Sequence, residues 1–256
     1  MVWLFLKEAH GKKKSKILEN LGSMKFNILL ISLLVFTSSC YSQKKANKED
    51  YSDDWAALHK YQQQNLDLGL PKKGEKRVVF LGSSIFEFWK EKDPAYFEGK
   101  AYIDRGISGQ ISPQLLIRFR QDVIDLHPKA VIILAGSNDL AGSKGHVDNK
   151  VIMDNIRSMT ELAKANKIKV ILCKYLPIYE YPWNKVRAAE SIMALNQEIE
   201  DYANQNKLTI LDYFTPLKDD RNGQRAEWTI DGVHPNLEGY KVMEKVTDEI
   251  INKVLK

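Results

Sequence analysis

Short runs of consecutive apolar residues, rich in Val and Ile, recur along this chain and are separated by longer stretches of mixed character. Four runs are clear and a fifth is weaker; in chain order they are "RVVFLG" (77–82), the weaker "AYIDRG" (101–106), "KAVIILAG" (129–136), "IKVILCKY" (168–175) and "LTILDYF" (208–214). A strand that is apolar at every position is buried on both faces, as in a parallel sheet covered by helices. The runs therefore predict the strands of a parallel sheet.

The stretches between these runs have the spacing of amphipathic helices. Their apolar positions recur three or four residues apart: Leu115, Leu116, Phe119 and Val123; Ile152, Ile156, Met159 and Ala163; Ile192, Leu195, Ile199 and Tyr202; Tyr240, Met243, Val246, Ile250 and Val254. Strands that alternate with helices predict an α/β fold, a three-layer α/β/α sandwich. A further helix is predicted over residues 51–66, with "LGLPKKGEK" (68–76) as the linker into the core.

Composition and charge narrow the class of protein. The 256 residues are 44% hydrophobic and 28% charged, which suits one ordinary globular domain with a full core. Six lysines and two glutamates lie in residues 1–40, so residues 41–256 hold 32 basic against 31 acidic residues, a net charge of +1. This balance predicts no basic face beyond the leader and argues against nucleic acid as a partner.

Residues 24–40, "MKFNILLISLLVFTSSC", have the layout of a secretory signal peptide: a lysine, a short apolar run and then small residues. Because this signal begins at Met24, we expect residues 1–23 to come from an upstream start codon. The end of the segment resembles a bacterial lipobox, which predicts lipidation of Cys40 and a membrane-anchored, exported protein. The alternative is cleavage after Ser42, which would release a soluble exported protein. In either case residues 41–76 are predicted to form a spacer and the N-terminal helix.

The second cysteine of the chain, Cys173, lies within an apolar run. With Cys40 lipidated, no disulfide can form within one chain. A lone cysteine in a buried strand usually serves as a small core residue, which is the role predicted for Cys173.

Polar residues and glycines follow the predicted strands, at the edge where ligands bind in open parallel sheets. They are Ser83 and Ser84 in "GSSI", Gly109 in "GISGQ", and Asn138 in "GSND"; Asp231 and His234 follow later in "DGVHPN". Each has an ordinary structural role as a helix cap, a turn or a loop residue. Together they contain a nucleophile, a base, an acid and several hydrogen-bond donors at one rim of the sheet.

Acyl transfer requires this combination of residue types. A serine hydroxyl becomes a nucleophile when a neutral imidazole accepts its proton, and a carboxylate fixes the tautomer of that imidazole. Ser84, His234 and Asp231 are the candidates for these three catalytic roles. The oxyanion-hole candidates are the backbone N–H groups of Ser84 and Gly109 and the side-chain amide of Asn138.

The four short segments that hold these residues resemble, in the right order, the four sequence blocks of the SGNH or GDSL hydrolases, over roughly residues 77–250. The resemblance implies an esterase or acylhydrolase on a flavodoxin-like, five-stranded parallel sheet, with residues 77–256 as the hydrolase domain. It also implies the catalytic and oxyanion-hole roles given above and no metal or organic cofactor. One position departs from the family: Ser83 stands where the first block commonly has Asp.

The leading functional prediction is an exported serine esterase that removes a short acyl group, often acetyl, from a carbohydrate or a similar small substrate. Aromatic residues near the predicted site offer either a stacking surface for a sugar ring or internal packing; they are Tyr175, Tyr179, Tyr181, Trp183 and Trp228. Two alternatives stay open. One is a lipid-directed acylhydrolase or thioesterase, and the other is an inactive surface lipoprotein that binds glycans.

Overall fold

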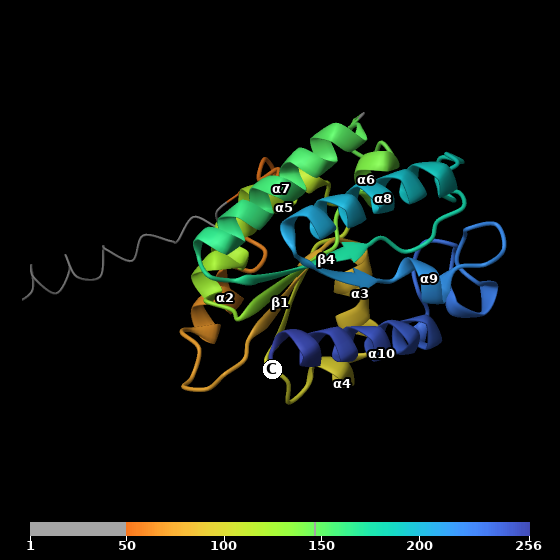
Figure 1. Ribbon diagram of the computed structural model, residues 1–256. Coiled ribbons are helices and arrows are strands. Elements are labelled where there is room, and N and C mark those ends of the chain that lie inside the picture. The colour runs from red at the N-terminus through yellow and green to blue at the C-terminus, as the bar shows by residue number, and fades with distance from the viewer. Residues whose placement is uncertain (1–49, 146) are drawn as a thin grey trace, which may run out of the picture. The chain divides into compact units, whose positions relative to one another are not determined.

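The computed structural model describes residues 50–145 and 147–256 (Figure 1). Residues Ser52–Lys256 form one compact unit. The predictions for residues 1–23, for the leader at 24–40 and for Cys40 fall outside the described residues.

The core of this unit is a five-stranded sheet in which every neighbouring pair of strands is parallel, in the order β2-β1-β3-β4-β5. The strands are β1 (Val78–Gly82), β2 (Tyr102–Gly106), β3 (Ala130–Ile133), β4 (Lys169–Lys174) and β5 (Thr209–Asp212). Each lies within one of the five predicted apolar runs. Strands β1 and β3 are buried at every position, as continuous apolar runs require.

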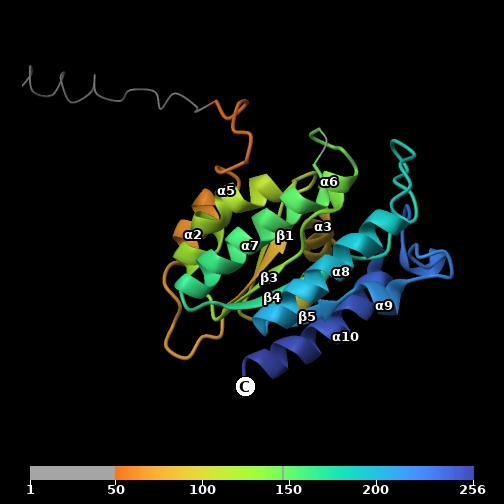
Figure 2. The ribbon, with the colours of Figure 1, turned by 45° about the horizontal axis from the view of Figure 1, so that its top comes forward.

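Helices cover both faces of the sheet, as the ribbon views show (Figures 1 and 2). The α-helices are α2 (Gln62–Leu68), α3 (Ser84–Lys92), α4 (Pro94–Phe97), α5 (Ser112–Asp122), α6 (Ser137–Leu140), α7 (Asn149–Ala165), α8 (Ala189–Asn206), α9 (Phe214–Leu217) and α10 (Leu237–Val254), and two 3₁₀ helices are η1 (Ile124–Leu126) and η2 (Ala226–Trp228). The predicted α/β/α sandwich with five parallel strands is confirmed.

The pleat of the strands divides the core into two clusters. Val79 and Leu81 of β1 point into a cluster built with α5, α7 and α8, whereas Val78 and Phe80 point into one built with α3, α4 and α10. Cys173 is 2% exposed and belongs to the second cluster, as predicted for a small core residue. Burial raises the pKa of its thiol well above the usual value, which keeps it neutral.

The helix predicted over residues 51–66 is wrong at both ends. Residues 52–61 form turns, and helix α2 begins only at Gln62 and ends at Leu68. A φ of +53° at Ala57 is incompatible with a continuous helix. The carboxylate of Asp54 accepts the backbone N–H of His59 at 3.0 Å, so a side chain satisfies a donor that a helix would otherwise use.

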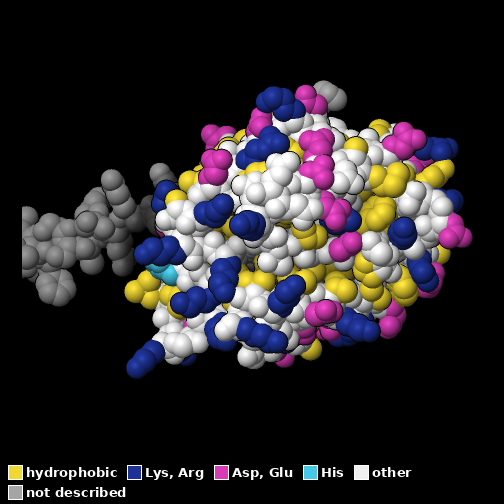
Figure 3. Space-filling model, in the orientation of Figure 1, with side chains coloured by type: hydrophobic (Ala, Val, Ile, Leu, Met, Phe, Trp, Pro, Cys, Tyr) yellow, Lys and Arg dark blue, Asp and Glu magenta, His cyan; other side chains and the backbone are white. Residues whose placement is uncertain are grey.

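Basic side chains gather over the end of the sheet where the strands begin (Figure 3). A hollow there is lined by Lys76, Lys129, Lys167, Lys169, Leu255 and Lys256. Lys76 and Lys169 donate to the carbonyl oxygens of Leu255 and Val254, so two of these ammonium groups satisfy acceptors at the end of α10. Net charge alone does not reveal such a local patch. Among the described residues, none of the helices combines the length and the apolar character that crossing a bilayer requires.

Candidate active site

Ser84 is the first residue of α3, directly after the turn that ends β1. The turn is tight because Gly82 has no side chain; a Cβ there would lie 2.8 Å from Cδ2 of Phe86. Ser84 is 8% exposed and lies just beyond the carboxyl end of β1. The first N–H groups of a helix have no partner within that helix, so the Ser84 N–H points out of α3 as a donor.

The side chains of Ser84, His234 and Asp231 form a continuous hydrogen-bonded chain. Ser84 Oγ lies 3.0 Å from Nε2 of His234, and Nδ1 of the same ring lies 2.8 Å from Oδ2 of Asp231. An ionised carboxylate only accepts hydrogen bonds, so Nδ1 carries the proton and Nε2 presents its lone pair to the serine hydroxyl. This is the tautomer that a general base requires.

The carboxylate of Asp231 is held by the loop that it begins. Its Oδ1 accepts the backbone N–H groups of Val233 at 2.9 Å and of His234 at 2.8 Å. Burial raises the pKa of Asp231, but the hydrogen bonds from His234 and Val233 outweigh burial and bring the pKa below its usual value. The acid therefore stays ionised at neutral pH. The carbonyl of His234 in turn accepts the N–H of Ile230 at 2.9 Å, which closes the loop on itself.

The other two predicted oxyanion-hole residues are Gly109, on the loop between β2 and α5, and Asn138, in the short helix α6 that follows β3. Gly109 has a φ of +75°, a left-handed conformation that favours glycine, and a Cβ there would meet no atom within 4 Å. The Asn138 side-chain amide donates to the Gln110 carbonyl at 3.0 Å, which joins α6 to the loop that bears Gly109. A primary amide has two N–H bonds, so Asn138 keeps a second donor for a substrate oxygen.

Two buried polar residues, Asp139 and Arg118, support these segments in a way that the sequence did not predict. The carboxylate of Asp139 accepts the N–H of Ser112 at 3.0 Å and its hydroxyl at 2.6 Å, and so joins the Asn138 segment to the start of α5. Arg118, which is 0% exposed, donates to the carbonyls of Gly82 and Arg105 and to the side-chain oxygen of Gln110. Asp139 ends the "GSND" block and Arg118 belongs to no recognisable motif. The sequence did not reveal the supporting role of either residue, because their partners are distant along the chain.

Ser83 points into the protein interior. It is 4% exposed and contacts Tyr175, whose phenol is fully buried. Burial raises the pKa of Tyr175 to about 12, and hydrogen bonds with Ser137 and Ser83 oppose that rise. The side chain that replaces the Asp of the resembled block therefore takes part in a buried hydroxyl cluster below the site.

The aromatic residues divide into packing and surface groups. Tyr175 and Tyr181 are 2% and 0% exposed, so they are packing residues. Trp183 is 51% exposed, and its ring centroid lies 6.3 Å from the ring of His234. The buried ring of Tyr181 supports Trp183 from below at 5.2 Å. Trp183 is thus an exposed aromatic surface beside the proposed base.

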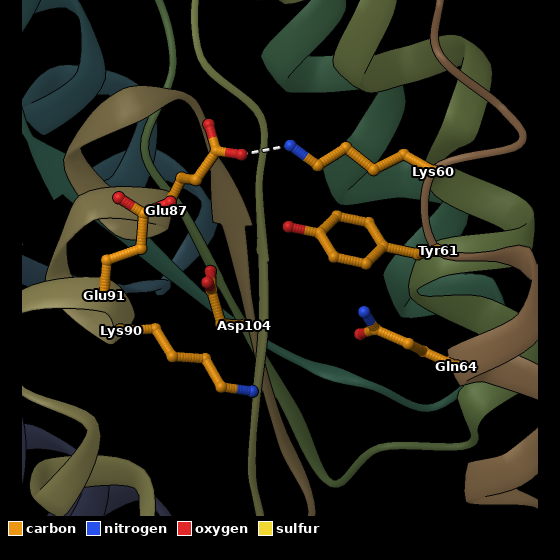
Figure 4. Close-up of a pocket in the computed structure, with 7 residues that line it drawn as sticks. All are labelled: Lys60, Tyr61, Gln64, Glu87, Lys90, Glu91 and Asp104. Carbon is orange, nitrogen blue, oxygen red and sulfur yellow. Dashed lines mark hydrogen bonds and ion pairs between the residues drawn. The ribbon is translucent and has the colours of Figure 1, made fainter.

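A hollow of about 390 Å³ lies next to the site, between residues 60–64 and α3 (Figure 4). It is lined by Lys60, Tyr61, Gln64, Glu87, Lys90, Glu91 and Asp104. Ser84 does not line it, so this hollow is beside the candidate catalytic residues and not among them. Within residues 50–145 and 147–256, no group of three or more His, Cys, Asp and Glu residues could hold a metal ion.

Comparisons with known proteins give a consistent picture. The model of the GDSL-like lipase/acylhydrolase family matches residues 80–242. A crystal structure of a GDSL-like lipase from Bacteroides thetaiotaomicron is 45% identical, with a TM-score of 0.76, over 77% of this chain and 98% of that one. An acetyl xylan esterase shares the fold at 21% identity and a TM-score of 0.55, over 68% of this chain and 99% of that one.

A sequence relative matches part of the chain. The uncharacterized lipoprotein YqeF of Bacillus subtilis is 33% identical over 81 residues, which are 30% of this chain. The match spans about a third of that lipoprotein, 33% of its length.

Proposed function

The chain belongs to the GDSL-like lipase/acylhydrolase family, and we propose that it is a serine esterase that removes short acyl groups, acetyl above all, from a carbohydrate. The family predicted from the four sequence blocks is thereby confirmed, and with it the class of enzyme, an ester hydrolase. The mechanism, the acyl group and the alcohol are the parts that we propose.

The hydrogen-bonded chain from Ser84 through His234 to Asp231 is the observation on which this proposal depends. Ser84 Oγ attacks the ester carbonyl carbon while His234 Nε2 takes the hydroxyl proton. The negative charge on the former carbonyl oxygen is stabilised by the N–H groups of Ser84 and Gly109 and by the amide of Asn138. Asp231 stabilises the imidazolium that forms.

Collapse of the tetrahedral intermediate breaks the bond to the alcohol oxygen, and His234 gives its proton to that oxygen as the alcohol leaves. The acyl group stays on Ser84. Water then attacks the acyl-enzyme, with His234 again accepting a proton, and returns Ser84 to its free hydroxyl as the carboxylic acid is released. The steps use side chains and backbone N–H groups of this chain together with one water molecule.

Trp183 supports a carbohydrate as the alcohol. Because His234 protonates the leaving oxygen, a side chain next to its ring contacts the alcohol part of the substrate and not the acyl part. An exposed indole held by a buried tyrosine offers a flat apolar surface, which suits the C–H face of a sugar ring. The fold is also shared with an acetyl xylan esterase.

A lipid-directed acylhydrolase is the second candidate, and Ile230 favours it. This residue adjoins Asp231 and is 58% exposed, so an apolar side chain is available to a longer acyl chain at the rim of the site. Hydrolysis of p-nitrophenyl acetate, butyrate and octanoate, beside acetylated xylan fragments, separates the two. We expect acetate and acetylated xylan to be the better substrates, and a preference for octanoate would favour the lipid-directed enzyme.

The two adjacent serines provide the test of the mechanism. Ser84→Ala should lower kcat by about 10⁴-fold or more, because the nucleophile is lost. A fluorophosphonate probe, which reacts with activated serines, should modify Ser84 and should fail to modify a His234→Ala variant. Labelling at Ser83, or undiminished hydrolysis by Ser84→Ala, would overturn the assignment.

We also propose that the protein is an exported lipoprotein anchored through Cys40. Support comes from the short apolar segment and small residues before Cys40 and from the lipoprotein relative. One lipid-modified cysteine would keep the enzyme at a membrane surface. Mass spectrometry of the mature N-terminus tests this, and an unmodified chain that starts near Gln43 would contradict it.

A further inference from the structure

Glu87 lies three residues after Ser84 on α3 and joins two other parts of the chain. Its Oε2 accepts the backbone N–H of Ser108 at 2.6 Å and also the Ser108 hydroxyl. Its Oε1 forms an ion pair with the ammonium of Lys60, from the segment before α2. Figure 4 shows the Glu87 carboxylate at the upper edge of the hollow, turned toward Lys60.

Ser108 directly precedes Gly109, whose N–H is a proposed donor to the oxyanion. The orientation of that N–H depends on the conformation of Ser108, because the peptide group between the two residues begins at the Ser108 carbonyl carbon. Ser108 is exposed, and the left-handed Gly109 that follows it has no side chain to pack. The two hydrogen bonds to Glu87 hold Ser108 by its backbone and by its side chain at once.

The base of the same loop is fixed independently of the Glu87 side chain. A Cβ on Gly106 would lie 2.3 Å from the backbone nitrogen of Glu87, so the end of β2 rests directly on the first turn of α3. The N–H of Ile107 donates to the Gly82 carbonyl at 3.2 Å. The base thus follows from backbone packing, whereas the exposed tip at Ser108 is held by a single side chain.

The carboxylate is well suited to this task. Burial raises the pKa of Glu87, but the hydrogen bonds from Lys60 and Ser108 outweigh burial, so its pKa lies below the usual value. The group is therefore ionised at neutral pH, and hydrogen bonds to an ionised acceptor are stronger and shorter than those to a neutral one.

We propose that Glu87 is a positioning residue for the oxyanion hole: it fixes the Gly109 N–H relative to Ser84, because α3 carries both the nucleophile and the carboxylate that holds Ser108. This inference rests on the proposed function, in which Ser84 and Gly109 act on the same ester carbonyl. Glu87 itself touches neither the substrate nor the reacting atoms.

Kinetics of two Glu87 variants and one control test the inference. Glu87→Ala should lower kcat for p-nitrophenyl acetate about tenfold and change KM by less than about twofold, since a displaced donor weakens binding of the transition state more than binding of the ester. Glu87→Gln keeps an acceptor for the Ser108 N–H and should recover most of kcat. Glu91→Ala removes an exposed carboxylate one turn later in the same hollow and should behave as the unmodified enzyme.

Hydrogen–deuterium exchange of residues 103–111 gives a readout that does not depend on turnover. The Ser108 N–H should exchange faster in Glu87→Ala than in the unmodified protein, and Glu87→Gln and Glu91→Ala should keep its protection. Equal losses of kcat in the Ala and Gln variants, an effect on KM alone, or unchanged exchange in Glu87→Ala would overturn the inference. Full activity in Ser84→Ala would instead remove the proposed function, while exchange still reports whether Glu87 holds Ser108.

Discussion

Replacing Asp104 with Asn should stabilise the protein, and the size of the effect should depend on pH. Asp104 lies in β2 at the base of the loop that holds Gly109, and its Oδ1 accepts the N–H of Gly106 at 2.8 Å. Burial raises the pKa of its carboxyl from 3.8 to about 7; nearby charges act in both directions, with Lys90 and Arg105 lowering it and Glu87 raising it.

The magnitude follows from this shift. The pKa of Asp104 differs by about three units between the folded and unfolded states, which corresponds to about 4 kcal/mol at about 1.36 kcal/mol per pKa unit. Because the folded-state pKa is raised, the folded protein binds a proton that the unfolded chain releases between about pH 4 and pH 7. Stability therefore increases as the pH falls through 7, and the full penalty for the charged carboxylate applies above pH 7.

Asn retains a carbonyl oxygen for the Gly106 N–H but cannot ionise. The free energy of unfolding is measured in urea by tryptophan fluorescence. For Asp104→Asn it should be larger than that of the unmodified protein by up to about 4 kcal/mol at pH 8 and by less than about 2 kcal/mol at pH 5. Asp220→Asn, at an exposed loop position, is the matched control. It should change the free energy of unfolding by no more than about 0.5 kcal/mol at either pH. Equal stability of Asp104→Asn and the unmodified protein at pH 8, or a difference that does not change with pH, would refute the reasoning.

Three further substitutions test the site itself. Asn138→Ala should lower kcat by about 100- to 1,000-fold with a smaller effect on KM, and an unchanged kcat would remove the amide from the oxyanion hole. Trp183→Ala should raise KM for acetylated xylan fragments about two- to tenfold, since aromatic contacts contribute roughly 0.5–1.5 kcal/mol, while hydrolysis of methyl acetate stays the same; equal effects on both esters would exclude stacking on the sugar. Ser83→Ala should cost about 1 kcal/mol in urea unfolding and less than about tenfold in kcat, and a loss as large as that of Ser84→Ala would contradict its structural role.

The strands and the proposed catalytic residues could be predicted from the sequence because their sequence signals are local. A buried parallel strand is a continuous apolar run, and each of the five runs contains a strand. Asp231 and His234 lie within four residues of one another, so a single loop brings them together. The position of Ser84 follows from the strand that ends at Gly82 and the helix that begins directly afterwards.

The residues that support the site could not be predicted from the sequence, because their contacts join positions that are distant along the chain. Arg118 binds carbonyl groups 36 and 13 residues away, at Gly82 and Arg105, and nothing around it in the sequence distinguishes it from a surface arginine. Glu87 reads as an ordinary polar position on an amphipathic helix, yet it holds Ser108. The structure of residues 52–61 was missed for a related reason, since their turns follow from side-chain contacts and not from periodicity.

Those turns give the segment before α2 a direct part in supporting the site. The hydroxyl of Tyr61 donates to the Gly106 carbonyl, and the Gln110 side chain donates to the Ala56 carbonyl at 2.7 Å. Lys60 neutralises the carboxylate that holds Ser108. The Gln110 contact reaches the loop between β2 and α5, which bears Gly109, and the Tyr61 contact reaches the last residue of β2, directly before that loop. This segment therefore supports the loop from outside the sheet while α3 supports it through Glu87. A chain that begins at residue 77 would keep the proposed catalytic residues but lose the contacts made by Ala56, Lys60 and Tyr61.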